Sequence, residues 1–161
     1  MEGIRTAACI FSFVSLLLLI VALATNYWMM DSAQRVHMGL WQACKDNNCA
    51  SYGMSVSGAI HAVRAFVLMG MVAGAVSFVG LCASFSHTHI GSISIKHLAV
   101  SASFVAGFCS MIAMSTFTGV YSDVTLFFGT LFGWSFGLGW ASFILFLITG
   151  LLAYYTGSSS E

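Results

Sequence analysis

Charged residues are scarce in this chain. Only 6% of its 161 residues are Asp, Glu, Lys or Arg, whereas 59% are hydrophobic, and proline is absent. Five basic and five acidic residues cannot supply the charged surface that a soluble domain of this length needs. The formal net charge is zero, so the sequence offers no basic patch for nucleic acid, and no nucleic-acid partner is expected.

Ionisable residues are missing from the long apolar stretches. No Asp, Glu, His, Lys or Arg lies within residues 7–25, 98–120 or 135–155. Pumps, transporters and intramembrane proteases place such groups inside the membrane, where they carry protons or perform catalysis. Their absence therefore argues against these three classes of protein.

Constellations for catalysis or metal binding are missing as well. No Ser-His-Asp triad or carboxylate pair can be assembled from the remaining residues. His87 and His89 lie near Cys82, but their spacing alone is weak support for a metal site, and a solvated turn is the preferred interpretation. We therefore expect no catalytic residues, no cofactor and no metal.

Four apolar stretches dominate what is present. Each has about the 20 residues that a helix needs to cross the ~30 Å hydrocarbon core of a bilayer. They are residues 7–25, 65–85, 98–120 and 135–155. The sequence thus predicts an all-α four-helix bundle in the lipid bilayer, formed by one domain over residues 1–161. The outer segments are 26–64 and 121–134.

The first stretch also has the features of a secretory signal. Arg5 precedes an apolar run that ends near Ala22-Leu23-Ala24, a pattern typical of a cleavage site. The uninterrupted run is longer than the roughly 7–15 residues of a signal core. Its length favours an uncleaved span.

Two cysteines in the first outer segment flank a strong turn signal. Cys44 and Cys49 enclose Lys45-Asp46-Asn47-Asn48, and Asp and Asn tolerate the left-handed backbone of tight turns. Residues that face each other across such a hairpin are close enough for a disulfide, which would stabilise by about 2 kcal/mol. A zinc site lacks further ligands nearby, and a reactive thiol lacks an activating group. A disulfide would place this loop in an oxidising compartment and both termini in the cytosol, although the distribution of Lys and Arg is a weak and slightly opposing signal.

The loop also carries a recognisable order of residues. Trp28, then Gly39-Leu40-Trp41, then Cys44 and Cys49 resembles the W…GLW…C…C signature of the claudin superfamily. Arg64-Ala65-Phe66 and Leu138-Gly139-Trp140 are similar to further motifs of that superfamily. The four-residue gap between the cysteines resembles the peripheral myelin, epithelial membrane and lens fibre branch. The resemblance implies a helix bundle topped by an antiparallel sheet of four or five strands, with four of them from the first outer segment.

The signature residues suit packing of the loop better than ligand binding. Trp28 follows the first span directly and is expected in the headgroup region, where amphipathic rings anchor helices. Leu40 and Trp41 are expected to cover the outer end of the bundle. Arg64 is expected to reach loop carbonyl groups or the carboxylate of Asp31.

Small residues recur at positions where backbones need to approach closely. Gly39 permits such an approach within the loop. Inside the spans, small residues four positions apart allow helices to pack closely, and packing within the bundle is the preferred interpretation. The pairs are Gly70 with Gly74, Ser103 with Gly107, and Gly133 with Gly137.

The second outer segment is rich in large apolar residues. Residues 124–128 are expected to form a short strand that joins the outer sheet. The apolar side chains of this region then form an exposed patch that contacts a partner or the headgroup layer. These residues are Leu126, Phe127, Phe128, Leu131 and Phe132.

The resemblance and the lack of a chemical site together imply a non-enzymatic function. We expect cell–cell adhesion or membrane organisation at the plasma membrane, at cell junctions, through outer-loop contacts with itself or related four-span proteins, laterally and in trans. The alternative is a regulatory or trafficking subunit that binds another membrane protein, either a channel or a component of a granule or vesicle membrane. An ion-selective pore is disfavoured, because the charges of Asp31, Arg35, Lys45 and Asp46 cancel.

Overall fold

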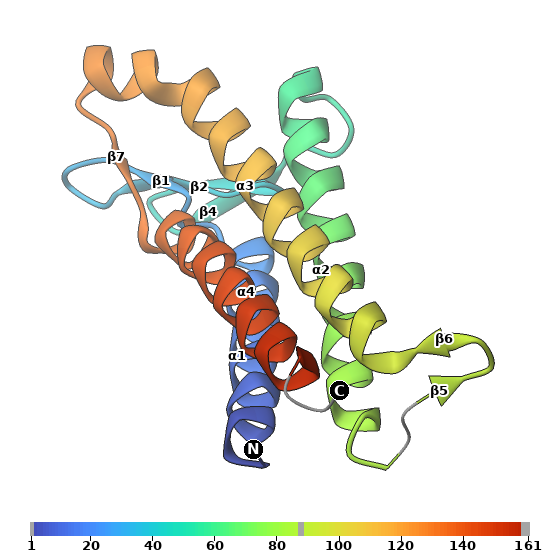
Figure 1. Cartoon of the computed structure of the whole chain (residues 1–161). Coiled ribbons are helices and arrows are strands. Elements are labelled where there is room, and N and C mark those ends of the chain that lie inside the picture. Colours follow the sequence, from blue (N-terminus) through green and yellow to red (C-terminus); the bar gives the residue numbers. More distant parts are fainter. Residues whose placement is uncertain (1, 87–88, 159–161) are drawn as a thin grey trace.

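Four long helices form the body of the protein (Figure 1). The computed structural model describes residues 2–86 and 89–158. The helices are α1 (Glu2–Ala24), α2 (Gly58–Ala83), α3 (Ile95–Phe128) and α4 (Trp134–Ser158). Each is long and apolar enough to cross a membrane. The predicted four-helix membrane bundle is confirmed, and the chain is a multi-pass membrane protein.

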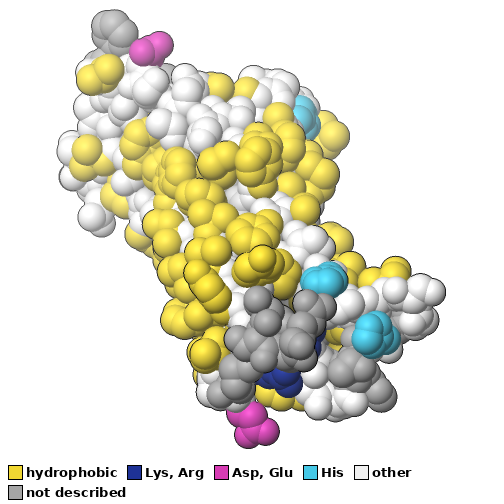
Figure 2. Space-filling model, in the orientation of Figure 1, with side chains coloured by type: hydrophobic (Ala, Val, Ile, Leu, Met, Phe, Trp, Pro, Cys, Tyr) yellow, Lys and Arg dark blue, Asp and Glu magenta, His cyan; other side chains and the backbone are white. Residues whose placement is uncertain are grey.

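The helices close into a ring. α1 packs against α2 and α4, and α3 packs against the same two helices. The ring of Phe146 is fully buried inside this arrangement, together with Leu19, Val67 and Met114. Figure 2 shows hydrophobic side chains over the middle of the visible face, whereas its acidic, basic and histidine side chains lie toward the ends. This distribution is what a bilayer-spanning body requires.

Small residues allow the close helix contacts that the sequence predicts. A Cβ atom added to Gly74 would lie 2.6 Å from the ring of Phe146, and one added to Gly70 would lie 3.3 Å from Leu19. Gly107 likewise faces Phe146. The prediction of close helix packing at Gly133 and Gly137 is wrong. Gly137 faces open space, and Gly133 precedes α4 and packs against the backbone of residue 27.

Hydrogen bonds between side-chain hydroxyl groups connect the helices at two places. Ser77 of α2 and Ser103 of α3 share a buried hydrogen bond of 2.5 Å. Thr25, just beyond α1, and Ser135 of α4 share one of 2.7 Å. Such bonds satisfy polar groups that lipid cannot satisfy.

A five-stranded antiparallel sheet lies at one end of the bundle, here called the sheet end. Its order is β4-β3-β2-β1-β7. The strands are β1 (Met29–Met30), β2 (Val36–Met38), β3 (Gln42–Lys45), β4 (Asn48–Ser51) and β7 (Leu131–Phe132). Figure 1 shows the sheet across the ends of α1 and α4, while α2 and α3 extend past it. Four strands thus come from the first outer segment and one from the second, as expected.

The β3–β4 hairpin closes through two residues with positive φ. Asp46 has φ 46° and Asn47 has φ 68°, the backbone of a type I′ turn, whose twist matches that of the flanking strands. Cys44 lies opposite Cys49 in the register, and a disulfide joins them with 4.0 Å between their Cα atoms. The predicted disulfide is confirmed.

The expected strand at residues 124–128 is wrong. These residues are helical, because α3 continues to Phe128 and ends at Gly129, whose φ of 61° is left-handed. Apolar and β-branched residues favour a strand locally, but no residue between 120 and 128 breaks the helix. The fifth strand, β7, follows the turn instead and pairs with β1.

A second, two-stranded hairpin lies at the opposite end. It consists of β5 (His89–Ile90) and β6 (Ile93–Ser94), with Gly91 in the turn at φ 62°. His87, the first member of the His-x-His pair, lies outside the described residues. Within residues 2–86 and 89–158, no three His, Cys, Asp or Glu side chains gather as a metal site would need.

Candidate functional site

Trp28 joins the sheet to the bundle from within. Its side chain is fully buried rather than placed among headgroups, which corrects the expectation from the sequence. The indole N–H donates a 2.7 Å hydrogen bond to the carbonyl of Ala22. The ring packs edge-on against Phe117 of α3 and Phe136 of α4, at 4.9 and 6.2 Å between centroids. One side chain therefore contacts three helices and fixes the start of β1.

Arg64 of α2 holds the loop from the other side. Its side chain is only 5% exposed. Nε and Nη2 donate to the carbonyl of Leu40 at 2.9 and 2.5 Å, and Nη1 donates to the carbonyl of Gly53 at 3.1 Å. Of the two partners expected from the sequence, the structure thus selects the carbonyls. The carboxylate of Asp31 accepts the backbone N–H of Ser32 instead.

The rest of the signature packs around Arg64. Leu40 is fully buried in the main core, as expected. The ring of Trp41 is 40% exposed and lies over the guanidinium of Arg64, 4.5 Å from centroid to Cζ. A Cβ atom on Gly39 would lie 2.6 Å from the Cα atom of Asn26, so only glycine fits where the loop crosses the end of α1.

The α4 side of the sheet is fixed through backbone bonds. Gly133 donates to the carbonyl of Trp28 at 2.9 Å, and Ser135 donates to the carbonyl of Tyr27 at 3.1 Å. Tyr27 also stacks on the ring of Trp134, with 5.4 Å between centroids. Sheet, α1 and α4 therefore form one continuous hydrogen-bonded unit.

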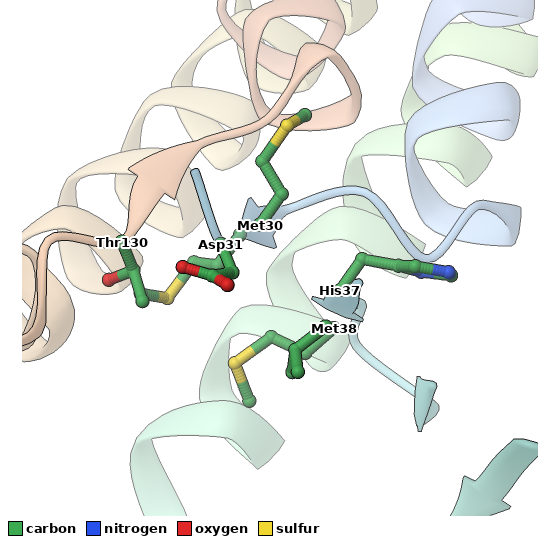
Figure 3. A pocket seen from close by; sticks show the side chains of 7 residues that line it. Met30, Asp31, His37, Met38 and Thr130 are labelled. Carbon is green, nitrogen blue, oxygen red and sulfur yellow. The ribbon is translucent and has the colours of Figure 1, made fainter. Parts of the chain in front are cut away.

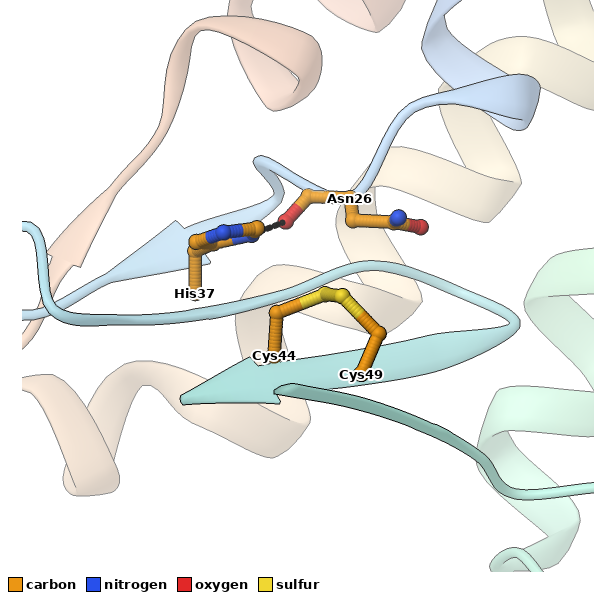
Figure 4. Close-up of a disulfide and its surroundings, with 4 residues drawn as sticks. All are labelled: Asn26, His37, Cys44 and Cys49. Atoms are coloured by element: carbon orange, nitrogen blue, oxygen red, sulfur yellow. Dashed lines mark hydrogen bonds between the residues drawn. A yellow bond between two sulfur atoms is a disulfide. The ribbon is translucent and has the colours of Figure 1, made fainter. Parts of the chain in front are cut away.

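His37 makes two contacts that the sequence did not predict. Its ring stacks on Tyr27 with 4.2 Å between centroids, and its Nδ1 atom lies 3.0 Å from the carbonyl of Asn26. Figure 4 shows this contact beside the disulfide of Cys44 and Cys49. No local pattern marks His37, because its neighbours come together only when β2 pairs with β1.

Tyr52 lies at a cavity of about 190 Å³ between the sheet and the ends of α2 and α3. Its buried hydroxyl finds no hydrogen-bond partner among the described residues. Burial raises the pKa of Tyr52 to about 12, nearby Tyr121 adds to the rise, and Arg64 opposes it. Tyr121 lines the same cavity.

This raised pKa predicts a stability loss in alkali. The folded state holds the Tyr52 proton up to about pH 12, whereas the unfolded chain releases it near pH 10. The free energy of unfolding should therefore fall as the pH rises from 10 to 12. Tyr52→Phe should lose less over this interval and match or exceed the parent protein at pH 7, because it removes a buried hydroxyl without a partner. Denaturation midpoints of both proteins at pH 7, 10 and 12 check this, and equal alkaline losses would contradict it.

A second cavity, of about 240 Å³, opens on the sheet. It is lined by residues of β1 and β2 together with Asp31 and Thr130. Figure 3 shows the Asp31 carboxylate directed toward Thr130, whereas the ring of His37 points away. Three of the lining side chains are methionines, Met29, Met30 and Met38, which adapt readily to apolar partners.

The residues predicted for partner contact divide into three groups. Leu126 and Leu131 are 81% and 58% exposed. Phe132 does not belong to the exposed patch that the sequence predicts, because it packs against the core and stacks on Phe136 with 4.4 Å between centroids. The side chains of Phe127 and Phe128 lie outside what the structure describes.

Comparison with known proteins shows where this architecture belongs. The model of the PMP-22/EMP/MP20/Claudin family matches residues 4–153. Protein NKG7 of Bos taurus is 31% identical, over 95% of this chain and 91% of that protein. Lens fiber membrane intrinsic protein of Homo sapiens is 29% identical, over 87% and 83%. Epithelial membrane protein 1 of Homo sapiens is 23% identical, over 86% and 87%.

The family match spans all four helices and the sheet. Proteins of this family are non-enzymatic membrane proteins. This chain, with its four spans and disulfide-pinned sheet, belongs to the PMP-22/EMP/MP20/Claudin family.

Proposed function

We propose that the protein organises contacts between membranes or between membrane proteins through its sheet end, in cell–cell adhesion at the plasma membrane. The observation that carries this proposal is the exposure of two apolar side chains of the second outer segment, Leu126 near the end of α3 and Leu131 of β7, together called the apolar corner. Thr130, the residue before Leu131, lines the cavity of β1 and β2. Exposed apolar patches next to an apolar hollow are typical of partner-binding surfaces.

The rigidity of the sheet supports this proposal. Trp28, Arg64 and the Cys44–Cys49 disulfide fix it to the bundle and to itself. A surface that is already ordered loses little conformational entropy when a partner binds. The disulfide also supports an extracellular or luminal location for the sheet, with both termini in the cytosol.

The partner that fits this surface best is a second copy or a related four-span protein. Leu126 is near the end of α3, which extends past the sheet (Figure 1), and Leu131 is in the strand β7; both side chains are exposed and therefore within reach of a neighbouring molecule. We infer that the contact is made by Leu126 and Leu131, whereas Phe132 supports the corner from the core.

Cell clustering tests this proposal. Expression in non-adherent cells should cause clustering, and Leu126→Ser with Leu131→Ser should return it to the level of untransfected cells at unchanged surface expression. Met54→Ser is the matched control, because Met54 is 80% exposed but lies in the loop before α2, and it should cluster like the parent protein.

Two outcomes would contradict the proposal. Unchanged clustering in the double variant would remove the corner from the contact. An absence of clustering by the parent protein, with co-purification of a channel or vesicle component, would replace adhesion by the regulatory or trafficking role.

A further inference from the structure

Two free cysteines meet at the end of the bundle opposite the sheet. Cys9 of α1 and Cys82 of α2 have their sulfur atoms 3.7 Å apart, although 73 positions separate them in the sequence. Both are free thiols; Cys82 is exposed and Cys9 partly buried. We propose that they form an oxidant-sensitive modification site, in which a peroxide joins α1 to α2 by a disulfide. This inference is independent of the proposed contact function.

The two sulfur atoms need to move only a short distance to form a disulfide. The sulfur atoms must approach by about 1.7 Å to reach the ~2.0 Å of a disulfide. The surroundings of Cys9 are apolar, because it packs, like Val100 and Leu152, against the cluster of Ala8, Leu81, Ala99 and Ala153. Three of these four are alanines, so the cluster presents little bulk to the Cys9 side chain.

The chemistry requires an external two-electron oxidant, and hydrogen peroxide supplies it. The thiolate of the exposed Cys82 attacks one peroxide oxygen, the O–O bond breaks, and a sulfenic acid and hydroxide form. The Cys9 thiol then attacks the Cys82 sulfur, an S–S bond forms, and the sulfenic hydroxyl leaves as water after taking up a proton. In total, two thiols lose two electrons and two protons, and one peroxide becomes two waters.

The position of the pair relative to the sheet disulfide fits its two free thiols. The Cys44–Cys49 disulfide lies in the sheet, whereas Cys9 and Cys82 lie near the other ends of α1 and α2. If the sheet faces an oxidising compartment, the thiol pair lies in the cytosolic halves of the first two spans, on the side of the membrane where glutathione keeps thiols reduced. A rise in peroxide on that side is then the signal that closes the bond.

The bond would strengthen one particular helix interface. α1 packs more extensively on α4 than on α2, so a disulfide between α1 and α2 adds a link where the ring of helices has fewer contacts. It closes a long loop that contains four of the five strands of the sheet. Cross-links across long loops restrict the unfolded chain strongly, so the oxidised protein should unfold at a higher temperature.

Counting thiols tests the proposal directly. The purified full-length chain is treated with hydrogen peroxide, denatured, and labelled with a maleimide polymer that shifts its mobility on a gel. The untreated chain, with its Cys44–Cys49 disulfide intact, should carry three labels, for Cys9, Cys82 and Cys109, and the peroxide-treated chain one. Peptide mapping without reductant should find the Cys9 and Cys82 peptides joined, two hydrogens lighter than their sum.

Two variants complete the experiment. Cys109→Ser is the matched control, because it removes a free thiol that lies in α3 and not in the pair. After peroxide treatment this variant should still contain the Cys9–Cys82 cross-link and should carry no label. Cys82→Ser should form no cross-link and retain two labels; if it fails to fold, peptide mapping of the parent chain decides. Three labels after peroxide treatment, oxidation of single thiols without a link, or a link only between two copies would overturn the proposal.

Discussion

Replacing Arg64 by leucine should detach the sheet from α2. The substitution removes three hydrogen bonds to the carbonyls of Leu40 and Gly53 and the ring contact with Trp41. The Leu40 carbonyl is then buried without this donor, and loss of a buried charged donor costs roughly 3 kcal/mol. In a domain of this size that lowers the unfolding midpoint by about 6–12 °C. Thermal unfolding in detergent measures it.

Two further variants separate geometry from charge. Arg64→Lys keeps the positive charge but lacks the planar fork that reaches two carbonyls at once, so its midpoint should lie between those of the parent and Arg64→Leu. Arg35→Leu removes an exposed arginine and should change the midpoint by no more than about 2 °C. If Arg64→Leu behaves like Arg35→Leu, the buried arginine does not hold the loop.

Trp28→Ala is expected to have an effect of similar or greater size. The change leaves a cavity between Phe117 and Phe136 and removes the donor to the Ala22 carbonyl. Large-to-small changes at buried aromatic positions cost about 3–5 kcal/mol. The midpoint should fall by about 6–20 °C, and the amount of protein at the cell surface should fall with it.

The indole nitrogen can be tested apart from the ring. Trp28→Phe keeps most of the buried area and loses the hydrogen bond to Ala22, for a cost of about 1–2 kcal/mol. Trp134→Ala removes a tryptophan that is 47% exposed and should cost about 1 kcal/mol through its stacking on Tyr27. Equal losses for Trp28→Ala and Trp134→Ala would show that burial of Trp28 does not govern stability.

Local chemistry made part of the fold predictable. The four spans follow from apolar length alone, and the hairpin follows from Asp46-Asn47 between two cysteines. For Arg64 the sequence leaves two partners open, loop carbonyls or the carboxylate of Asp31, and the structure shows the carbonyls. The spans and the hairpin depend on composition or on residues close in sequence.

The features that could not be predicted depend on how distant segments meet. Trp28 after a span is typical of a headgroup anchor, and only the return of α3 and α4 buries it. Residues 124–128 suit a strand as well as a helix, and the helix continues because Gly129 is the first stop. The contact of Cys9 with Cys82 depends on the register of α1 against α2, which no local pattern records.

The length of α3 has a mechanical consequence. Its 34 residues form one helix of about 51 Å, so the exposed tip at Leu126 continues without a joint into the membrane-spanning part. The sequence contains no proline that would kink it. A displacement of the tip by a bound neighbour is therefore transmitted along one continuous helix into the membrane-spanning part and is not absorbed by a loop.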